Sequence, residues 1–229
     1  MRLAVVVPVL DEEVSLGRTL DSVRQVLEHG DLLVVSDGGS ADGTVAIAEG
    51  HGAVVVRGAP GRGEQLQRGA REALRLGARA LLFVHADTLL PQEARAQVMS
   101  ALERGAAGGG FTVAFDGARG RYRLGERIVN ARTRALRVPL GDQAQFASAE
   151  AFAASGGFPD WPILEDVELM RRLRRVGPIA VLEPPVITST RRFERRGTLR
   201  TVATNWLIWL LYRLGVSPHR LARLYQQAR

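Results

Sequence analysis

The sequence contains neither cysteine nor lysine. The lack of cysteine among 229 residues excludes disulfides, thiolate metal sites and a cysteine nucleophile. Because lysine is absent, all 31 basic side chains are arginines, whose guanidinium groups bind phosphates in a bidentate way. Aromatic residues make up only 6% of the chain and do not alternate with the arginines as a base-stacking surface would. We therefore expect no nucleic-acid partner.

Long apolar segments are also missing. The longest one, 206–211, is too short to cross a bilayer and lies between Asn205 and Arg213. The N-terminal run MRLAVVVPVLDEE is short and leads into acidic residues, which predicts a first strand and not a signal peptide. We therefore expect a cytoplasmic protein. Its net charge of +7 suits acidic small molecules or anionic surfaces.

The hydrophobic pattern predicts alternating strands and helices in the first half of the chain. This order is typical of an α/β fold with a mostly parallel sheet and helices on both faces. We expect a single domain, 1–229, with a first half (1–108), a second half (109–190) and C-terminal helices (191–229). The expected strands are 3–9, 32–35, 53–56, 80–84, 110–115, 179–182 and 186–190, with a short one after VPLGDQAQF. The expected helices are 13–28, 44–49, 64–76, 91–102, 124–136 and 164–176, followed by two more, the last opened by Ser217-Pro218.

Ligands of such sheets bind outside the carboxyl ends of the strands. The loops expected there read PVLDEE, SDGGSADG, RGAPGRG and HADT, and three of the four carry acidic residues. Asp37 is either part of a turn or a hydrogen-bonding partner of a base or ribose. Arg62 lies between glycines, either in a plain turn or in contact with a pyrophosphate.

The segment LLFVHADT ends a buried strand with an imidazole and a carboxylate. Alternation along a strand would place His85 and Asp87 on the same face. A carboxylate there could hold Mg²⁺ or Mn²⁺, because phosphate oxygens and water complete the shell of such ions. The alternative is that Asp87 or Thr88 caps the helix expected from Pro91.

A second acidic group opens the helix in WPILEDVELMRRLRR. Acidic residues are favourable at a helix N-terminus, and this alone explains the presence of Glu168 at the start of the expected helix. The adjacent pair Glu165-Asp166 follows an apolar run, and a carboxylate placed there can act as a general base. Asp142, in LGDQ, is the competing candidate for that base.

Taken together, these motifs resemble family 2 glycosyltransferases with the glycosyltransferase A-type fold. The matching pieces are VVVPVLDEE, VVSDGGSADGT, GRGEQLQRGA, LLFVHADT in the place of the Asp-x-Asp motif, and ILEDVELMRRLRR. They span residues 3–176 in order. HADT, LGDQ and LYRLGVSP further resemble a small bacterial subset described as radical-SAM or selenodomain-associated transferases. The resemblance implies an α/β, Rossmann-like central sheet.

The resemblance also implies roles for individual residues. The nucleotide-sugar site would comprise Pro8, Val9, Glu12, Asp37, Arg62 and Asp87, with a UDP-sugar as the expected donor. Asp87, and His85 in the place of the first aspartate, would hold Mn²⁺ or Mg²⁺. Asp166, supported by Glu165, would deprotonate an acceptor that is either lipid-linked or a small molecule, with inversion at the anomeric carbon. The expected acceptor-side residues are Asp142, Gln143 and Trp161.

Two other functions stay open at this point. A sugar-1-phosphate nucleotidyltransferase has a related sheet, but it needs a glycine-rich basic loop after the first strand, where this chain has PVLDEE. A non-catalytic nucleotide-sugar binder has no need of Glu165-Asp166.

The segment 198–214 forms a broad apolar helix face with Trp206, Leu207, Trp209, Leu210 and Leu214, beside Arg195, Arg196 and Arg200. This helix would pack on its own domain, lie at the inner face of a membrane or form a homodimer.

Overall fold

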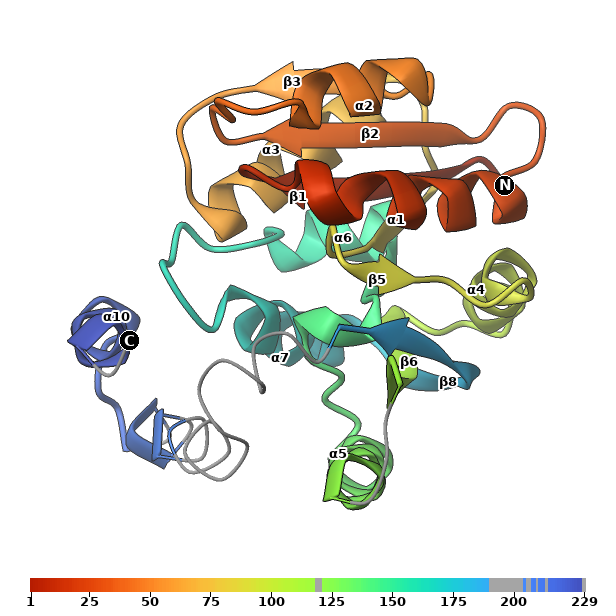
Figure 1. The fold of residues 1–229 in the computed structure, drawn as a ribbon. Helices are drawn as coiled ribbons and strands as arrows, with labels where there is room; N and C mark the ends of the chain where they lie inside the picture. Colours follow the sequence, from red (N-terminus) through yellow and green to blue (C-terminus); the bar gives the residue numbers. More distant parts are fainter. Residues whose placement is uncertain (118–120, 190–203, 205–206, 209, 213, 228–229) are drawn as a thin grey trace.

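The computed structural model describes residues 1–117, 121–189, 204, 207–208, 210–212 and 214–227 (Figure 1). One eight-stranded sheet runs through it in the order β3-β2-β1-β4-β7-β6-β8-β5. The strands are β1 (Leu3–Val9), β2 (Leu32–Asp37), β3 (Val54–Arg57), β4 (Ala80–Phe83), β5 (Thr88–Leu89), β6 (Gly108–Phe115), β7 (Phe146–Ser148) and β8 (Ile179–Thr188).

The predicted parallel sheet is confirmed for its first four strands. β1 pairs in parallel with β2 and β4, and β2 pairs in parallel with β3. Alternate residues of β1 enter two different cores, with Val5 in one and Val6 in the other. The strand is therefore buried on both faces, which is why its sequence is an unbroken apolar run.

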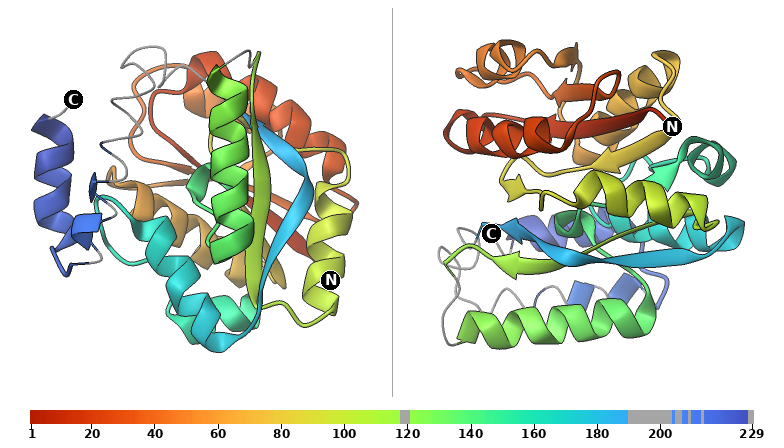
Figure 2. Two further views of the ribbon diagram at one scale, coloured as in Figure 1. Left: turned by 90° about the horizontal axis from the view of Figure 1, so that it is seen from below. Right: turned by 90° about the vertical axis from the view of Figure 1, so that its right-hand side faces the viewer.

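Helices cover both faces of the sheet, as predicted. Leucines and valines of α1 (Glu13–Val26) join the core on one face, together with residues of α4 (Ala94–Glu103). On the other face lie α3 (Arg62–Arg75), α6 (Ala149–Ser155) and α7 (Glu165–Val176). Figures 1 and 2 show α1 and α6 on opposite sides of the sheet. The remaining helices are α2 (Thr44–Gly50), α5 (Arg121–Leu136), the short 3₁₀ helix η1 (Gly141–Gln143) and α10 (Pro218–Gln227).

The second half of the sheet is mixed. β7 runs antiparallel to β4 and β6, β5 runs antiparallel to β8, and β6 is parallel to β8. The prediction of two strands at 179–182 and 186–190 is wrong, because β8 is a single strand through Pro184 and Pro185. The register shifts opposite Phe111 and Val113, and such an irregularity accommodates prolines, which cannot donate a ladder hydrogen bond.

Three consecutive glycines let β6 pack closely against its neighbours. A Cβ atom on Gly109 would lie 2.0 Å from the carbonyl oxygen of Ala180, and one on Gly108 would lie 2.4 Å from that of Phe146. A Cβ atom on Gly110 would meet the ring of Pro139 at 2.6 Å. Backbone atoms on both sides therefore exclude any side chain here.

The substitution Gly109→Ala should lower the free energy of unfolding by about 2–3 kcal/mol, because the methyl group displaces the backbone of β8. Denaturant unfolding followed by circular dichroism measures the change. The matched control is Gly50→Ala at the end of α2, where a Cβ atom meets nothing within 4 Å. A loss of stability in the control equal to that of Gly109→Ala would contradict the close-packing explanation.

The C-terminal segment is described only in part. Trp206, Trp209, Arg195, Arg196 and Arg200 lie outside the described residues, so a membrane or dimer contact through 198–214 stays a prediction. Within the described part, Leu207, Leu210 and Leu214 are exposed and Ile208 is buried. In the portions of the chain that the structure describes, no helix has the length and apolar character needed to span a bilayer.

Candidate active site

The loops after β1 and β2 are joined to each other by hydrogen bonds. The amide of Glu12 donates to Thr44 Oγ1 at 2.8 Å. The amide of Ala41 donates to Asp11 Oδ1, also at 2.8 Å. Pro8 is half-buried, Val9 is buried, and Glu12 precedes α1, where its carboxylate accepts from Ser15 Oγ at 2.7 Å. Three residues predicted for the nucleotide-sugar site, Pro8, Val9 and Glu12, therefore lie at or next to hydrogen-bonded loops.

Asp37 shapes the loop that follows its own strand. Its carboxylate accepts hydrogen bonds from Ser40 Oγ at 2.6 Å and from the amides of Ser40 and Gly39 at 3.0 and 3.1 Å. Burial alone would raise the pKa of Asp37, but these hydrogen bonds outweigh it and lower the pKa below its usual value. The turn interpretation of Asp37 is thus supported, and its contact with a base or ribose stays a prediction.

The HADT segment is a turn and not the end of a strand. β4 stops at Phe83, and the amide of Thr88 donates to the carbonyl of His85 at 3.1 Å. The prediction that His85 and Asp87 share a strand face is therefore wrong. The alternative that Asp87 or Thr88 caps the next helix is wrong as well. α4 begins at Ala94, its N-cap residue is Glu93, and no side chain caps it.

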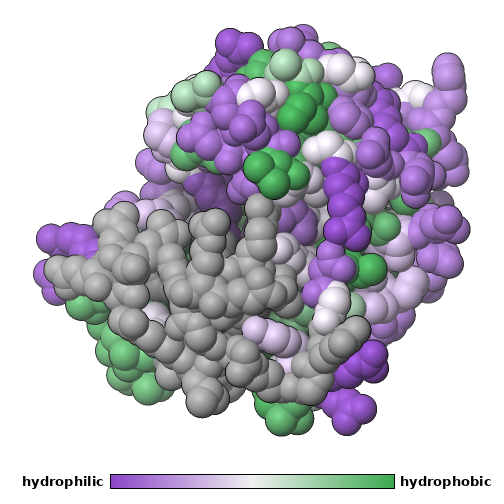
Figure 3. Space-filling model, viewed as in Figure 1, coloured by the Kyte–Doolittle hydropathy of each residue, from purple (hydrophilic) through white to green (hydrophobic). Residues whose placement is uncertain are grey.

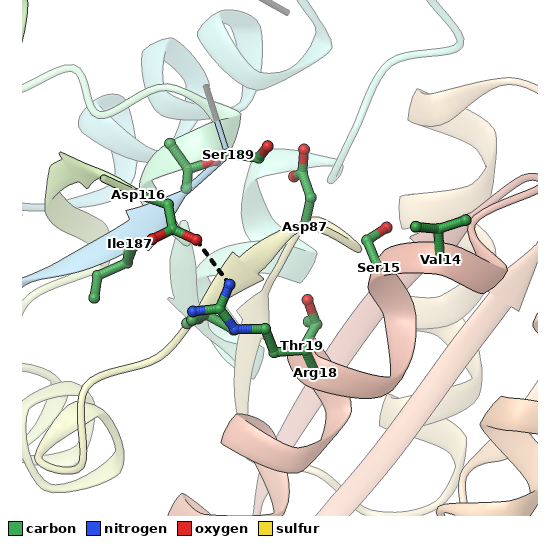
Figure 4. A pocket seen from close by; sticks show the side chains of 10 residues that line it. Val14, Ser15, Arg18, Thr19, Asp87, Asp116, Ile187 and Ser189 are labelled. Atoms are coloured by element: carbon green, nitrogen blue, oxygen red, sulfur yellow. Dashed lines mark hydrogen bonds and ion pairs between the residues drawn. The ribbon is translucent and has the colours of Figure 1, made fainter. Parts of the chain in front are cut away.

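Asp87 projects from this turn into a pocket of about 240 Å³ between α1 and the end of β8 (Figure 4). Ser15 and Ser189 lie on either side of it, and an ion pair of 2.7 Å between Arg18 and Asp116 lines another wall. The pocket offers carboxylates and hydroxyls, which suit a cation or a polyhydroxylated ligand.

Arg62 and Glu165 form an ion pair between the N-termini of α3 and α7. The Glu165 side chain is fully buried, whereas that of Arg62 is 36% exposed. Burial raises the pKa of Glu165, and the neighbouring Asp166 raises it further, although Arg62 acts in the opposite direction. Gly63 permits this approach, because a Cβ atom there would lie 2.7 Å from the carbonyl of Pro159.

Asp166 follows at the start of α7 and is 8% exposed. Its Oδ2 accepts from the amide of Gly141 at 2.7 Å, and its Oδ1 accepts from that of Val167 at 2.8 Å. A Cβ atom on Gly141 would lie 2.9 Å from His85 Nε2 and 3.2 Å from Asp166 Oδ2. The structure thus brings the side chains of His85 and Asp166 close to the same point beside Gly141.

The three acceptor-side candidates have different surroundings. Asp142 is close enough to Arg62 and Arg132 to act on the pKa of both. Gln143 is fully buried; it accepts from Thr133 Oγ1 at 3.0 Å and donates to the carbonyl of Phe111 at 2.9 Å. Its burial does not support a contact with the acceptor, which stays a prediction.

Trp161, the third candidate, packs edge-on against Tyr212 with ring centroids 6.1 Å apart. Tyr212 in turn donates to Glu168 at 3.0 Å. A described part of the C-terminal segment therefore contacts the loop and helix that carry Asp166.

Sequence reasoning missed two residues that hold Asp166 in place. One is Gly141, whose amide binds the carboxylate. The other is Gln145, which is buried and donates to the carbonyls of Pro139 at 2.8 Å and Asp166 at 3.1 Å. The signal was the pair of amide side chains in GDQAQF, because such groups are buried only when they are hydrogen-bonded.

No group of three or more His, Cys, Asp or Glu side chains that could hold a metal ion occurs among the described residues. An ion at Asp87 would therefore need oxygen atoms from a ligand. Phosphate oxygens are such atoms.

Comparison with known proteins decides the family. The model of glycosyl transferase family 2 matches residues 4–156. The chain belongs to this family. The match covers more than half of the chain and includes β1 to β7, with the HADT turn. No curated protein matches the chain.

Solved glycosyltransferase structures share the fold. TarS 1–349 of S. aureus has a TM-score of 0.67 and 17% identity, over 89% of this chain and 64% of that one. Its complex with UDP-GlcNAc has a TM-score of 0.66 and 17% identity, over 83% and 59%. Glucosyl-3-phosphoglycerate synthase of Mycobacterium tuberculosis, in complex with Mn²⁺ and UDP-glucose, has a TM-score of 0.57 and 24% identity, over 82% and 69%. The chain thus spans less than two thirds of TarS 1–349. These likenesses confirm the expected α/β fold of glycosyltransferase A type.

Glu168, also on α7, generates a pH-dependent prediction. Burial alone would raise its pKa, but hydrogen bonds from Arg171, Arg172 and Tyr212 outweigh this and lower the pKa from 4.5 to about 2. A carboxyl whose pKa is lower in the folded state stabilises the fold above its unfolded pKa. This contribution is lost as the pH falls from 4.5 toward 2.

The substitution Glu168→Gln should therefore cost about 3 kcal/mol of unfolding free energy at pH 7, since the pKa falls from 4.5 to about 2 and one pKa unit is worth about 1.4 kcal/mol. The difference from wild type should shrink below pH 4. Urea unfolding at several pH values measures it. Glu72→Gln, which removes an ion pair with Arg75 at the surface, serves as control and should change stability little. A difference that does not vary with pH would contradict the assignment.

Proposed function

We propose that this chain transfers a sugar from a UDP-sugar to an acceptor hydroxyl, with inversion at the anomeric carbon. The observation that carries the proposal is the meeting of His85, from the HADT turn, and Asp166, from α7, at Gly141. The turn expected on the donor side and the proposed general base thus lie close together beside Gly141. Support for the donor comes from TarS and glucosyl-3-phosphoglycerate synthase, which were crystallised with UDP-GlcNAc and UDP-glucose.

The donor nucleotide would bind at the carboxyl ends of β1 and β2. Pro8 and Val9 end β1, and Asp37 ends β2, in the part of the sheet where α/β proteins bind nucleotides. Arg68 of α3 adds positive charge there, since its guanidinium donates to the carbonyl of Asp37 at 2.8 Å. Arg62 would contribute to the diphosphate site only through the part of its side chain that Glu165 leaves exposed.

Asp87 of the HADT turn fits a divalent ion that is shared with a diphosphate, since it offers the hard oxygen ligand that Mg²⁺ and Mn²⁺ prefer. His85 lies beside Gly141 and is not among the residues that line the pocket of Asp87, so it would be a second ligand only if its ring turned toward the ion; its nitrogen suits Mn²⁺ better than Mg²⁺. One synthase of similar fold was crystallised with Mn²⁺. When bound, such an ion neutralises charge on the departing diphosphate.

Asp166 would act as the general base. The acceptor oxygen attacks the anomeric carbon while the bond from that carbon to the diphosphate oxygen breaks. The hydroxyl proton moves to Asp166, and the bonding electron pair leaves with UDP. Each carboxylate oxygen of Asp166 accepts one amide hydrogen bond, from Gly141 or Val167, which fixes its orientation and leaves lone pairs for the acceptor.

The substitution Asp87→Ala should strongly reduce UDP affinity and abolish its dependence on Mn²⁺. The reason is that the carboxylate is the proposed link between protein and cation. Calorimetric titration of UDP with and without Mn²⁺ measures both effects. Asp116→Ala, on the opposite wall of the same pocket, is the control and should keep the metal dependence. Unchanged, metal-dependent affinity in Asp87→Ala would refute the site.

The substitution Asp166→Asn should lower sugar transfer by at least about a hundredfold and leave donor affinity nearly intact, because the amide keeps the shape but is not a base. Released UDP, measured over a panel of nucleotide sugars and acceptors, is the readout. Asp142→Asn is the matched variant. Wild-type turnover in Asp166→Asn, with the loss in Asp142→Asn instead, would transfer the role to Asp142.

A further inference from the structure

Helix α5 turns a polar face toward the sheet. On this inner face, Asn130 exchanges two hydrogen bonds of 2.9 Å with the backbone of Val113, and Glu126 accepts from the amide of Phe115 at 2.6 Å. Thr133 is fully buried and donates to Gln143 at 3.0 Å. The helix is therefore attached to β6 and to η1 through polar side chains, beside Tyr122 and Val129, which pack against the core.

The outer face of α5 is apolar. Leu124 is 59% exposed and Ile128 is 54% exposed, and Ala131 and Ala135 are exposed as well. The four residues are spaced i, i+4, i+7 and i+11, so they form one stripe along the helix. A surface helix normally presents its apolar residues to the core. α5 does so with Tyr122 and Val129, but it carries this second apolar stripe on its solvent-exposed face.

Arginines accompany this outer stripe. Exposed Arg123, Arg127 and Arg134 follow one edge of the stripe with the same spacing, i, i+4 and i+11. The whole helix has five arginines and one glutamate, a net charge of +4, and that glutamate, Glu126, is bonded to β6. Arg134 also pairs with Glu183 of β8.

We propose that the outer face of α5, defined by Leu124, Ile128, Ala131 and Ala135 with the arginines beside them, binds an anionic lipid bilayer surface. Leucine and isoleucine would enter the boundary between head groups and acyl chains, and the arginines would reach the lipid phosphates. Nucleic acid would neutralise the arginines but would leave the apolar stripe exposed, and no aromatic side chain stands in the stripe for base stacking.

The position of α5 permits such contact. The left view of Figure 2 shows the helix in front of the sheet, with its length parallel to the viewed surface. Figure 3 shows hydrophobic surface at the lower edge of the molecule, where α5 lies in Figure 1. This proposal concerns binding alone and does not depend on the proposed reaction.

Flotation of the full-length chain with phosphatidylglycerol-containing vesicles tests it. Wild type should float with these vesicles and not with pure phosphatidylcholine vesicles, and binding should weaken as salt rises. Leu124→Ser/Ile128→Ser should lower the partition coefficient by about tenfold or more, and Arg123→Gln/Arg127→Gln by a similar factor. Because all four side chains are exposed, the melting temperature and donor hydrolysis should stay unchanged.

Matched controls remove one exposed apolar residue and two arginines elsewhere. Val176→Ser, at the end of α7, and Arg75→Gln/Arg104→Gln should float as wild type does. No flotation of wild type would overturn the proposal, as would undiminished flotation of Leu124→Ser/Ile128→Ser, which would assign binding to another surface such as 198–214. If the wild type is a dimer and Leu124→Ser/Ile128→Ser makes it a monomer, the face binds a second copy of the chain instead of lipid. If the wild type binds RNA tightly and does not float, the face binds nucleic acid.

Discussion

The ion pair between Arg62 and Glu165 is the interaction on which the site depends. A fully buried carboxylate is stable only with a partner, and Arg62 supplies one from the first turn of α3. The pair brings the N-terminus of α7 against α3, and Gly63 leaves the space that this contact requires. Asp166 is the next residue along the chain, so its position follows from the pairing of its neighbour.

The surroundings of this pair distinguish the two neighbouring carboxylates, Glu165 and Asp166. Asp142 and Asp166 both act on the pKa of Arg62 and of Arg132, so the two arginines and the three acidic residues form one electrostatic group. Glu165 is fully buried and committed to Arg62. Asp166 is fixed by two amides and retains a small exposed fraction. Of the two, only a carboxylate in the position of Asp166 is suited to exchanging a proton with a substrate.

Much of the first half could be predicted from the sequence, because valine-rich strands and leucine-spaced helices follow periods that leave few alternatives. The HADT segment could not be predicted, since a four-residue turn has no periodicity and the strand alternation ends at Phe83. The split of β8 was also wrong, because Pro184 and Pro185 normally end a strand. The pairing of Arg62 with Glu165 had no local signal at all: the two residues are 103 positions apart. The roles of the buried residues Gln143 and Gln145 can be recognised only once the backbone carbonyls that they bind are known.

The same separation of 103 positions has a consequence for the order in which the protein forms during synthesis. The strands β1, β2 and β3 can pair as soon as they leave the ribosome, since each lies next to a strand made just before or after it, and β4 then pairs with β1. At that moment Arg62 still lacks Glu165, its partner in the ion pair. The amide of Gly141 in η1 has no carboxylate to bind until α7 emerges. A nascent chain therefore already has the carboxyl ends of β1 and β2, while the residues around Asp166 are still being translated.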